Sequence, residues 1–336
     1  MFHRLERYGT QTTRSIVLLV LGMSFIPLND ALIKIMSERL PLAEIVAVRA
    51  IISLLIVILF MRGWRSIVAL DMKSITLFTL RGMCLVVAMY LYFLGLASLP
   101  ISIVVSIFFL SPIMITLLSA IILKEKIGTH RISAIIISVI GVLVIMRPGT
   151  ASYQIEMFFA LGAAISYALF QVMTRSLKSV GDLPALITIQ HLCYLISSFP
   201  LLFFNIFGNW QGSDNQSINF LLRSTHALSF TECLYLTICA LTVLFLSISS
   251  SYAYRNSEAS LVAPFEYVAI PVSVIWGIYI WGEWPELLSW LGMLLIFLGG
   301  VYAVYREHIQ KQHISSHIPM PVSTGMALHT DNNNAP

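Results

Sequence analysis

Apolar residues occupy this chain in ten long runs, and short polar segments separate most of them. A helix needs roughly 20 residues to cross a bilayer at 1.5 Å per residue, and most of these runs approach that length. The pattern therefore predicts an all-α integral membrane protein with ten transmembrane helices. The predicted helices are Ile16–Met36, Leu42–Met61, Ile75–Leu96, Ile101–Leu123, Ile132–Met146, Ile155–Thr174, Leu183–Phe204, Phe230–Tyr252, Ser260–Ile280 and Leu287–Val304.

The second five runs resemble the first five. A unit with an odd number of helices, duplicated in tandem, enters the membrane in opposite orientations and gives an inverted repeat, as in many secondary transporters. The paired positions are Leu21-Gly22 with Leu161-Gly162, Arg49 with His191, Ser111-Pro112 with Ile270-Pro271, and Gly141 with Gly299. The sequence separation between paired positions grows along the chain because the second repeat contains the long segment Asn205–Ser229.

This duplication divides the chain into three parts. Residues 1–150 form the first five-helix repeat, residues 151–307 form the second, and residues 308–336 are predicted to be a disordered cytoplasmic tail. The tail contains several histidines, but they lack a recognised ligand spacing and predict no metal site. The polar segment Asn205–Ser229 is predicted to be an exposed loop.

Composition agrees with a membrane protein. The chain is 58% hydrophobic and 11% charged, whereas soluble domains carry roughly 25% charged residues, so lipid must cover part of its surface. The net charge of +4 does not indicate a nucleic-acid partner, because the basic residues lie at helix ends and form no single patch. The four cysteines lie in apolar runs without metal-ligand spacing, and we interpret them as reduced packing residues.

The distribution of Lys and Arg predicts the orientation. With the N-terminus in the cytoplasm, most basic residues flank cytoplasmic helix ends, and both termini lie on that side. The segment Lys34–Arg39 follows the first run where a signal peptide would carry a small-residue cleavage site, so this run is predicted to be a retained helix.

Four polar residues lie in the first two predicted helices. Asn29, Asp30 and Lys34 occupy the outer half of the first helix, and Arg49 lies at a matching depth in the second. Such groups need a partner or a water-filled cavity within the membrane. They either line a transport path or form a structural Asp30–Arg49 ion pair. Either interpretation predicts an interaction between Asp30 and Arg49 that tolerates exchange of the two charges better than loss of one.

Glu266 lies about 9 Å inside the ninth predicted helix, between Pro264 and Pro271. Proline frees backbone carbonyls, which is tolerated at this depth only where protein or water covers the backbone. The carboxyl group could carry a proton, face a cationic or hydrogen-bonding ligand, or be satisfied by a neighbouring hydroxyl. The first role predicts that Glu266 couples transport to a proton gradient.

Other candidates for the transport path are Gln171 and His191, toward the cytoplasmic ends of the sixth and seventh helices. They either form an inner counterpart of the Asp30–Arg49 layer or are hydrogen-bonded packing residues. Tyr90 and Tyr267 are the aromatic residues deep enough to stack on a planar ligand, whereas aromatic residues near helix ends are typical of interface anchors.

Small residues in the sixth predicted helix repeat every four positions, at Ala160, Ala164 and Ala168. This spacing lets helices approach closely. We interpret it as packing within the chain, with a homodimer surface as the alternative.

The sequence lacks a phosphate-binding glycine loop ending in Lys-Ser or Lys-Thr, a paired-histidine zinc motif and a nucleophile elbow. We therefore expect no enzymatic activity, no cofactor and transport driven by a gradient. A membrane scaffold or an integral-membrane enzyme is the alternative, and it predicts no central cavity large enough for a ligand.

The chain resembles the drug/metabolite transporter superfamily, in its ten-helix EamA-type branch. The resemblance covers Ile16 to Arg306. It rests on Leu-Asn-Asp-Ala-Leu-Ile-Lys at Leu28–Lys34, the helix of Arg49, Ser111-Pro112, Leu-Lys-Glu-Lys-Ile at Leu123–Ile127, Gly141 and Arg147-Pro148-Gly149. The residues of the first helix look most like those of bacterial uptake carriers for riboflavin or S-adenosylmethionine.

The resemblance implies a carrier in a bacterial inner membrane that moves a small organic metabolite by alternating access. Helices one to four and six to nine would surround its cavity, and helices five and ten would be peripheral. A vitamin or nucleotide-like metabolite is the expected substrate, with riboflavin as the narrowest choice. Uptake of S-adenosylmethionine and export of amino acids or drugs are the alternatives.

Overall fold

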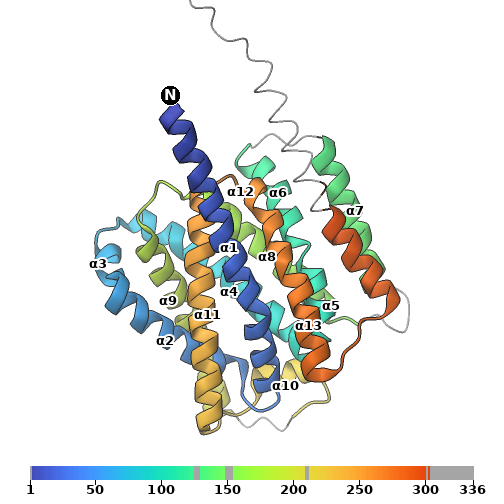
Figure 1. Cartoon of the computed structure of the whole chain (residues 1–336). Helices are drawn as coiled ribbons and strands as arrows, with labels where there is room; N and C mark the ends of the chain where they lie inside the picture. Colours follow the sequence, from blue (N-terminus) through green and yellow to red (C-terminus); the bar gives the residue numbers. More distant parts are fainter. Residues whose placement is uncertain (1, 125–128, 148–153, 209–211, 300–301, 303–336) are drawn as a thin grey trace, which may run out of the picture.

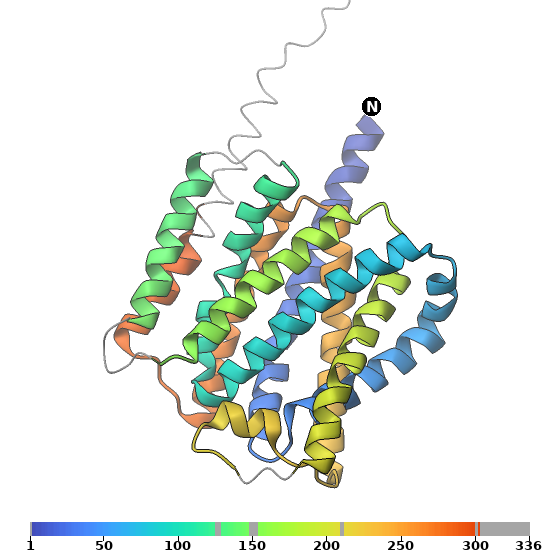
Figure 2. The same ribbon diagram turned by 180° about the vertical axis from the view of Figure 1, so that it is seen from behind.

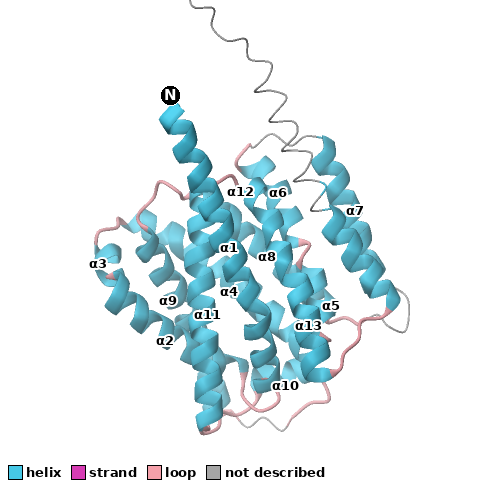
Figure 3. Ribbon diagram, viewed as in Figure 1, coloured by secondary structure: helices cyan, strands magenta, loops and turns pink. Residues whose placement is uncertain are grey.

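A computed structural model of the chain describes residues 2–124, 129–147, 154–208, 212–299 and 302, and all regular structure in these ranges is helical (Figures 1 and 3). The predicted all-α class is confirmed for this part of the chain. The predicted tail 308–336 lies outside it. Among the described residues, seven helices are long and apolar enough to cross a membrane, at Thr13–Met36, Leu42–Met61, Met72–Ser98, Ile101–Ile122, Met157–Ser176, Leu183–Phe207 and Phe230–Asn256. Two shorter apolar helices follow, at Phe265–Trp281 and Leu287–Gly299.

Most of the helices follow the apolar runs, with the differences described below. In chain order they are α1 (Phe2–Met36), α2 (Leu42–Met61), α3 (Gly63–Val68), α4 (Met72–Ser98), α5 (Ile101–Phe108), α6 (Ser111–Ile122), α7 (Thr129–Met146), α8 (Met157–Ser176), α9 (Leu183–Phe207), α10 (Gln216–Leu222), α11 (Phe230–Asn256), α12 (Ala259–Val262), the 3₁₀ helix η1 (Ala263–Val268) and α13 (Ala269–Trp281).

The predicted helix Ile101–Leu123 is interrupted. Phe109 and Leu110 separate α5 from α6, and Pro112 lies in the first turn of α6. Proline fits there because the first N–H groups of a helix have no partner within the helix. The apolar run is continuous, so its hydrophobicity alone does not reveal the interruption.

The predicted helix Ser260–Ile280 is divided into three pieces, α12, η1 and α13. Pro264 lies in the first turn of η1, and Pro271 lies near the start of α13. A short stretch of 3₁₀ helix within a longer helical path often marks a hinge. The carboxyl group of Glu266 lies within this stretch.

The segment Asn205–Ser229 was predicted to be an exposed loop, and the structure corrects this. It contains α10, which Asn215 caps by accepting a hydrogen bond from the N–H of Ile218 at 3.2 Å. Phe220 is fully buried, and Ser217 donates to the carbonyl oxygen of Leu94 in α4 at 2.6 Å. The buried aromatic face of α10 covers the ends of α4 and α9.

The long helices pack so that segments far apart in sequence lie side by side. α1 packs along α11, α2 along α9, and α4 against both α8 and α9 (Figures 1 and 2). Figure 1 shows α7 and the helix Leu287–Gly299 together at one edge of the bundle. These two helices approach closely, because a Cβ atom added at Gly141 would lie 2.8 Å from the carbonyl oxygen of Gly292.

Candidate functional site

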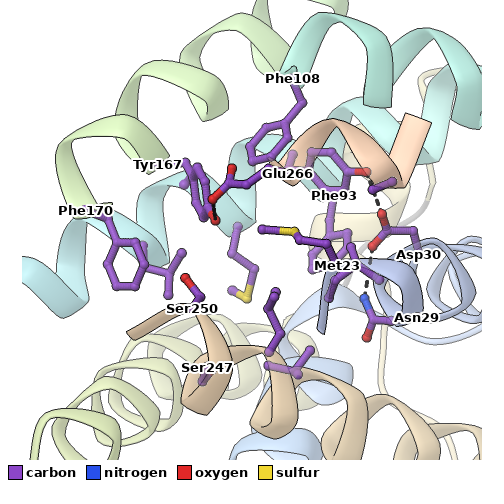
Figure 4. A pocket seen from close by; sticks show the side chains of 18 of the residues that line it. Met23, Asn29, Asp30, Phe93, Phe108, Tyr167, Phe170, Ser247, Ser250 and Glu266 are labelled. Atoms are coloured by element: carbon purple, nitrogen blue, oxygen red, sulfur yellow. Dashed lines mark hydrogen bonds between the residues drawn. The ribbon is translucent and has the colours of Figure 1, made fainter. Parts of the chain in front are cut away.

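A cavity of about 140 Å³ lies in the middle of the bundle (Figure 4). Its wall is mostly apolar and aromatic, with a few polar groups, which is typical of a binding site for a small molecule. Helices from both halves of the chain contribute to it. The lining includes Met23, Asn29 and Asp30 of α1, Arg49 of α2, Leu85, Met89, Tyr92 and Phe93 of α4, Phe108 of α5, Tyr167 and Phe170 of α8, Gln190 and Tyr194 of α9, Ser247 and Ser250 of α11, and Glu266 of η1.

Asp30 and Arg49 both line the cavity, but they do not form the direct ion pair that the sequence suggested. The amide of Asn29 lies between them: Asn29 donates to Asp30 Oδ1 at 3.0 Å and accepts from Arg49 Nη1 at 3.3 Å. The hydroxyl of Tyr92 donates to Asp30 Oδ2 at 2.7 Å. An amide can bridge in this way because it carries both a donor and an acceptor.

The guanidinium of Arg49 is buried without a carboxylate partner among the described residues. Its Cζ atom lies 5.4 Å from the ring centroid of Phe93, and its Nη2 lies 3.5 Å from the sulfur of Met89. Nε has no hydrogen-bond partner. Arg49 therefore presents both positive charge and an unused donor at the cavity wall.

Glu266 is fully buried and also lines the cavity. Tyr167 donates to its Oε1 at 3.1 Å (Figure 4), and Tyr254 donates to the same oxygen at 2.7 Å. Oε2 has no hydrogen-bond partner. Gln171 does not line the cavity; its side-chain amide donates to the hydroxyl of Tyr167 at 2.5 Å. The amide of Gln171 and the carboxyl of Glu266 thus belong to one chain of hydrogen bonds.

A second buried arginine, Arg81 of α4, lies beside the cavity. It donates to Thr174 Oγ1 at 2.6 Å, to Gln190 Oε1 at 3.2 Å and to Ser251 Oγ at 3.0 Å. Its Cζ atom lies 4.0 Å from the ring centroid of Phe170. Sequence reasoning did not select Arg81, although a cation six residues inside a predicted membrane helix was the available signal.

Lys34 does not line the cavity. Its ammonium group lies at the end of α1, where it donates to the carbonyl oxygen of Leu99 at 2.9 Å and to Glu283 Oε1 at 3.1 Å. Glu283 Oε2 accepts from the N–H of Ile101 at 3.4 Å. This cluster joins the ends of α1 and α4, the start of α5 and the segment after α13.

Three other candidates lie behind the cavity wall. Tyr90 donates to the carbonyl oxygen of Ser197 at 3.4 Å, the ring of His191 packs on Tyr194 at 5.8 Å, and the ring of Tyr267 packs on Phe109 at 5.8 Å. Nε2 of His191 has no hydrogen-bond partner. The aromatic residues that line the cavity include Tyr92, Tyr167 and Tyr194 instead.

Within the described ranges, no three His, Cys, Asp or Glu side chains come together as a metal site would require. The cavity can hold a small molecule by stacking, by hydrogen bonds and by its buried charges. Together with the helices that are long and apolar enough to cross a membrane, this cavity defines a multi-pass membrane protein with an internal site for a small solute.

The model of the EamA-like transporter family matches residues 13–147 and again residues 154–305. The chain therefore belongs to this family, and it is a multi-pass small-molecule transporter of a bacterial inner membrane.

Curated relatives carry different substrates. The chain is 25% identical to a riboflavin transporter of Vibrio cholerae over 86% of this chain and 92% of the relative. It is 26% identical to the pseudopaline exporter CntI of Pseudomonas aeruginosa over 84% and 92%, and 22% identical to an S-adenosylmethionine uptake transporter of Rickettsia prowazekii over 83% and 88%. A solved crystal structure superposes with a TM-score of 0.64 at 14% identity, over 90% of this chain and 99% of that one. That likeness concerns the fold alone.

Proposed function

We propose that the protein takes up a vitamin or nucleotide-like metabolite by alternating access, and riboflavin is the first compound to test. The observation that carries this proposal is the central cavity, whose aromatic rings suit a planar ligand and whose buried polar groups suit a polar substituent. The similarity to a riboflavin transporter supports the choice of compound.

The fold proposed for this activity has ten transmembrane helices in two inverted repeats, residues 1–150 and 151–307, with both termini in the cytoplasm. The double match of the family model supports the duplication. The two helix interruptions support it independently: the break before Ser111-Pro112 and the break before Ile270-Pro271 occupy paired positions. Interrupted helices that meet at a midplane cavity are a feature of transporters built from inverted repeats.

The cavity must change size during the cycle. At about 140 Å³ it is smaller than the roughly 300–1,000 Å³ of typical ligand pockets, so a metabolite needs the surrounding helices to separate. At one end, Lys34 and Glu283 join the two halves. At the other end of the bundle, where α12 lies in Figure 1, α11, α12 and α6 contribute Tyr254, Val262 and Ile115 to one cluster of buried apolar residues. Alternate opening of these two contacts gives access to each side.

Glu266 is proposed to couple this cycle to a proton gradient. Its Oε2 atom is unpartnered at the cavity, and no cation lies within ion-pair distance among the described residues. An ionised carboxylate in that position is costly, so Oε2 would bind a proton before the site closes and release it when the site opens to the cytoplasm.

The test is uptake of labelled riboflavin, S-adenosylmethionine and nucleosides by cells auxotrophic for each compound and expressing the full chain. Accumulation of riboflavin above the vector control supports the proposal. Accumulation of S-adenosylmethionine alone would replace the substrate, and efflux of preloaded compound without uptake would make the protein an exporter. Absence of flux for every compound, in well-expressed protein, would contradict the proposal.

A further inference from the structure

The two buried arginines beside the cavity share an unusual property. Neither Arg49 nor Arg81 has a carboxylate within 4.0 Å in the part of the chain that the structure describes. Arg81 is fully buried, and its three hydrogen-bond acceptors are the neutral groups of Thr174, Gln190 and Ser251. A guanidinium has five N–H donors, so two of those of Arg81 remain for another acceptor.

The acidic residues of the cavity do not compensate these charges by contact. Asp30 accepts from Tyr92 and Asn29, and Glu266 accepts from two tyrosine hydroxyls. Buried cations without a paired anion are costly in the membrane, and intramembrane charges usually mark the path of a substrate or ion. The arrangement therefore leaves positive charge that a ligand can neutralise.

The two guanidiniums lie beside different turns of α4. Arg49 contacts Met89, which follows Arg81 by two turns of α4, so the sites are separated by roughly 12 Å along that helix. Arg49 lines the cavity, and Arg81 lies behind its wall: Gln190 and Phe170, which contact Arg81, line the cavity from α9 and α8.

We propose that the transported substrate carries a carboxylate or phosphate, and that this anionic group binds Arg49 at one stage of the cycle and Arg81 at another. This inference rests on the proposed transport function and narrows its substrate class to anionic metabolites, so it favours riboflavin 5′-phosphate over riboflavin, which carries neither group. Charge-assisted hydrogen bonds from a guanidinium to an oxyanion are stronger than those Arg81 makes to neutral groups. Before the anionic group binds, the guanidinium of Arg81 is held by its hydrogen bonds to Thr174, Gln190 and Ser251. The ring of Phe170 packs on the guanidinium plane.

The experiment uses pairs of planar compounds that differ by one anionic group, bound to the purified full-length protein in lipid nanodiscs. The pairs are riboflavin and riboflavin 5′-phosphate, adenosine and adenosine monophosphate, and indole-3-ethanol and indole-3-acetate. We expect the anionic member of at least one pair to bind about tenfold more tightly than its neutral partner, which corresponds to one charge-assisted contact. The first two pairs differ by a phosphate and the third by a carboxylate, so the pair that shows the preference identifies the anionic group.

Arg81→Gln should reduce the affinity for the anionic member more than the affinity for the neutral member, and Arg81→Lys should keep part of the preference. Arg65→Gln, at an exposed arginine in α3, is the matched control and should change neither affinity. The preference of the unaltered protein tests the anionic substrate even if Arg81→Gln does not fold, and Arg81→Lys then tests the site.

Equal binding within every pair, tighter binding of the neutral members or absence of binding by every anionic probe would overturn the inference. A preference that survives in Arg81→Gln would overturn the role of Arg81. If cells take up riboflavin but the purified protein shows no preference for anionic compounds, this inference fails and the proposed transport function stands. Anion-selective binding without flux of any compound would count against transport alone.

Discussion

The ammonium of Lys34 lies 3.1 Å from Oε1 of Glu283, although 249 residues separate the two in the chain. The same ammonium lies 5.0 Å from the ring centroid of Trp281. Both side chains are partly accessible, so this contact is worth no more than about 1 kcal/mol in a static structure. The Lys34–Glu283 contact joins the end of α1 to the segment after α13. A weak contact in this position can break and re-form as the two segments move apart and together.

Glu283→Gln should weaken closure at this end of the cavity and reduce the rate of accumulation several-fold, with little loss of thermal stability. Glu286→Gln is the matched control, because Glu286 is an exposed acid three residues away that pairs with Arg147. Initial uptake rates and melting temperatures check this. Equal rates for both variants would show that the Lys34–Glu283 contact does not govern access.

Asn29 should be as important to the site as the two charges it joins. Asn29→Ala removes both the donor to Asp30 and the acceptor for Arg49, and we expect uptake to fall at least as far as in Asp30→Asn. A protein in which Asp30 and Arg49 are exchanged should be no more active than Asp30→Asn. The sequence alone predicts that this exchange is tolerated better than the loss of one charge. In the exchanged protein the hydroxyl of Tyr92 would lose its carboxylate acceptor.

Uptake by Asn29→Ala, Asp30→Asn and the exchanged protein checks this, with expression levels measured for each. Full activity of the exchanged protein would restore the simpler interpretation of a direct Asp30–Arg49 pair.

The close approach of Gly141 to Gly292 provides a test of packing. A Cβ atom at either position would lie within 2.8 Å of the other glycine's carbonyl oxygen, and backbone cannot move aside cheaply. Gly141→Ala should therefore destabilise the protein by about 1–3 kcal/mol. Gly162→Ala is the control, since the nearest obstacle is the flexible side-chain end of Leu91 at 3.1 Å. Melting temperatures of the two variants should differ clearly, and equal values would contradict the close contact between α7 and the helix Leu287–Gly299.

Run length and hydrophobicity were sufficient to predict the helical class and the positions of most helices. They were insufficient for the interruptions, because an apolar run such as Ile101–Leu123 has the same composition whether or not it breaks at Phe109 and Leu110. The hidden helix α10 had a local signal in its cap residue Asn215, but burial of Phe220 depends on contacts with distant helices.

The site was predicted in part. Asn29, Asp30, Arg49 and Glu266 line the cavity, and polarity within apolar runs identified them. Arg81 carried the same signal, a charge within an apolar run, and was missed. Its place beside the cavity depends on acceptors from α8, α9 and α11, which no spacing along the chain reveals. Depth within a helix favoured Tyr90, whereas the helical register directs Tyr92 toward Asp30.

Glu266→Gln should separate exchange from accumulation. The amide keeps the size and an acceptor oxygen for Tyr254 and Tyr167, but it cannot release a proton into the cytoplasm. We expect exchange of internal for external substrate to continue, while accumulation driven by a proton gradient is lost. Glu38→Gln, at an exposed acid after α1, is the control and should retain both activities. Vesicles with an imposed pH gradient provide the measurement. If the Gln variant accumulates substrate with an unchanged dependence on the gradient, Glu266 is a hydrogen-bonding residue of the cavity wall and the driving force acts elsewhere.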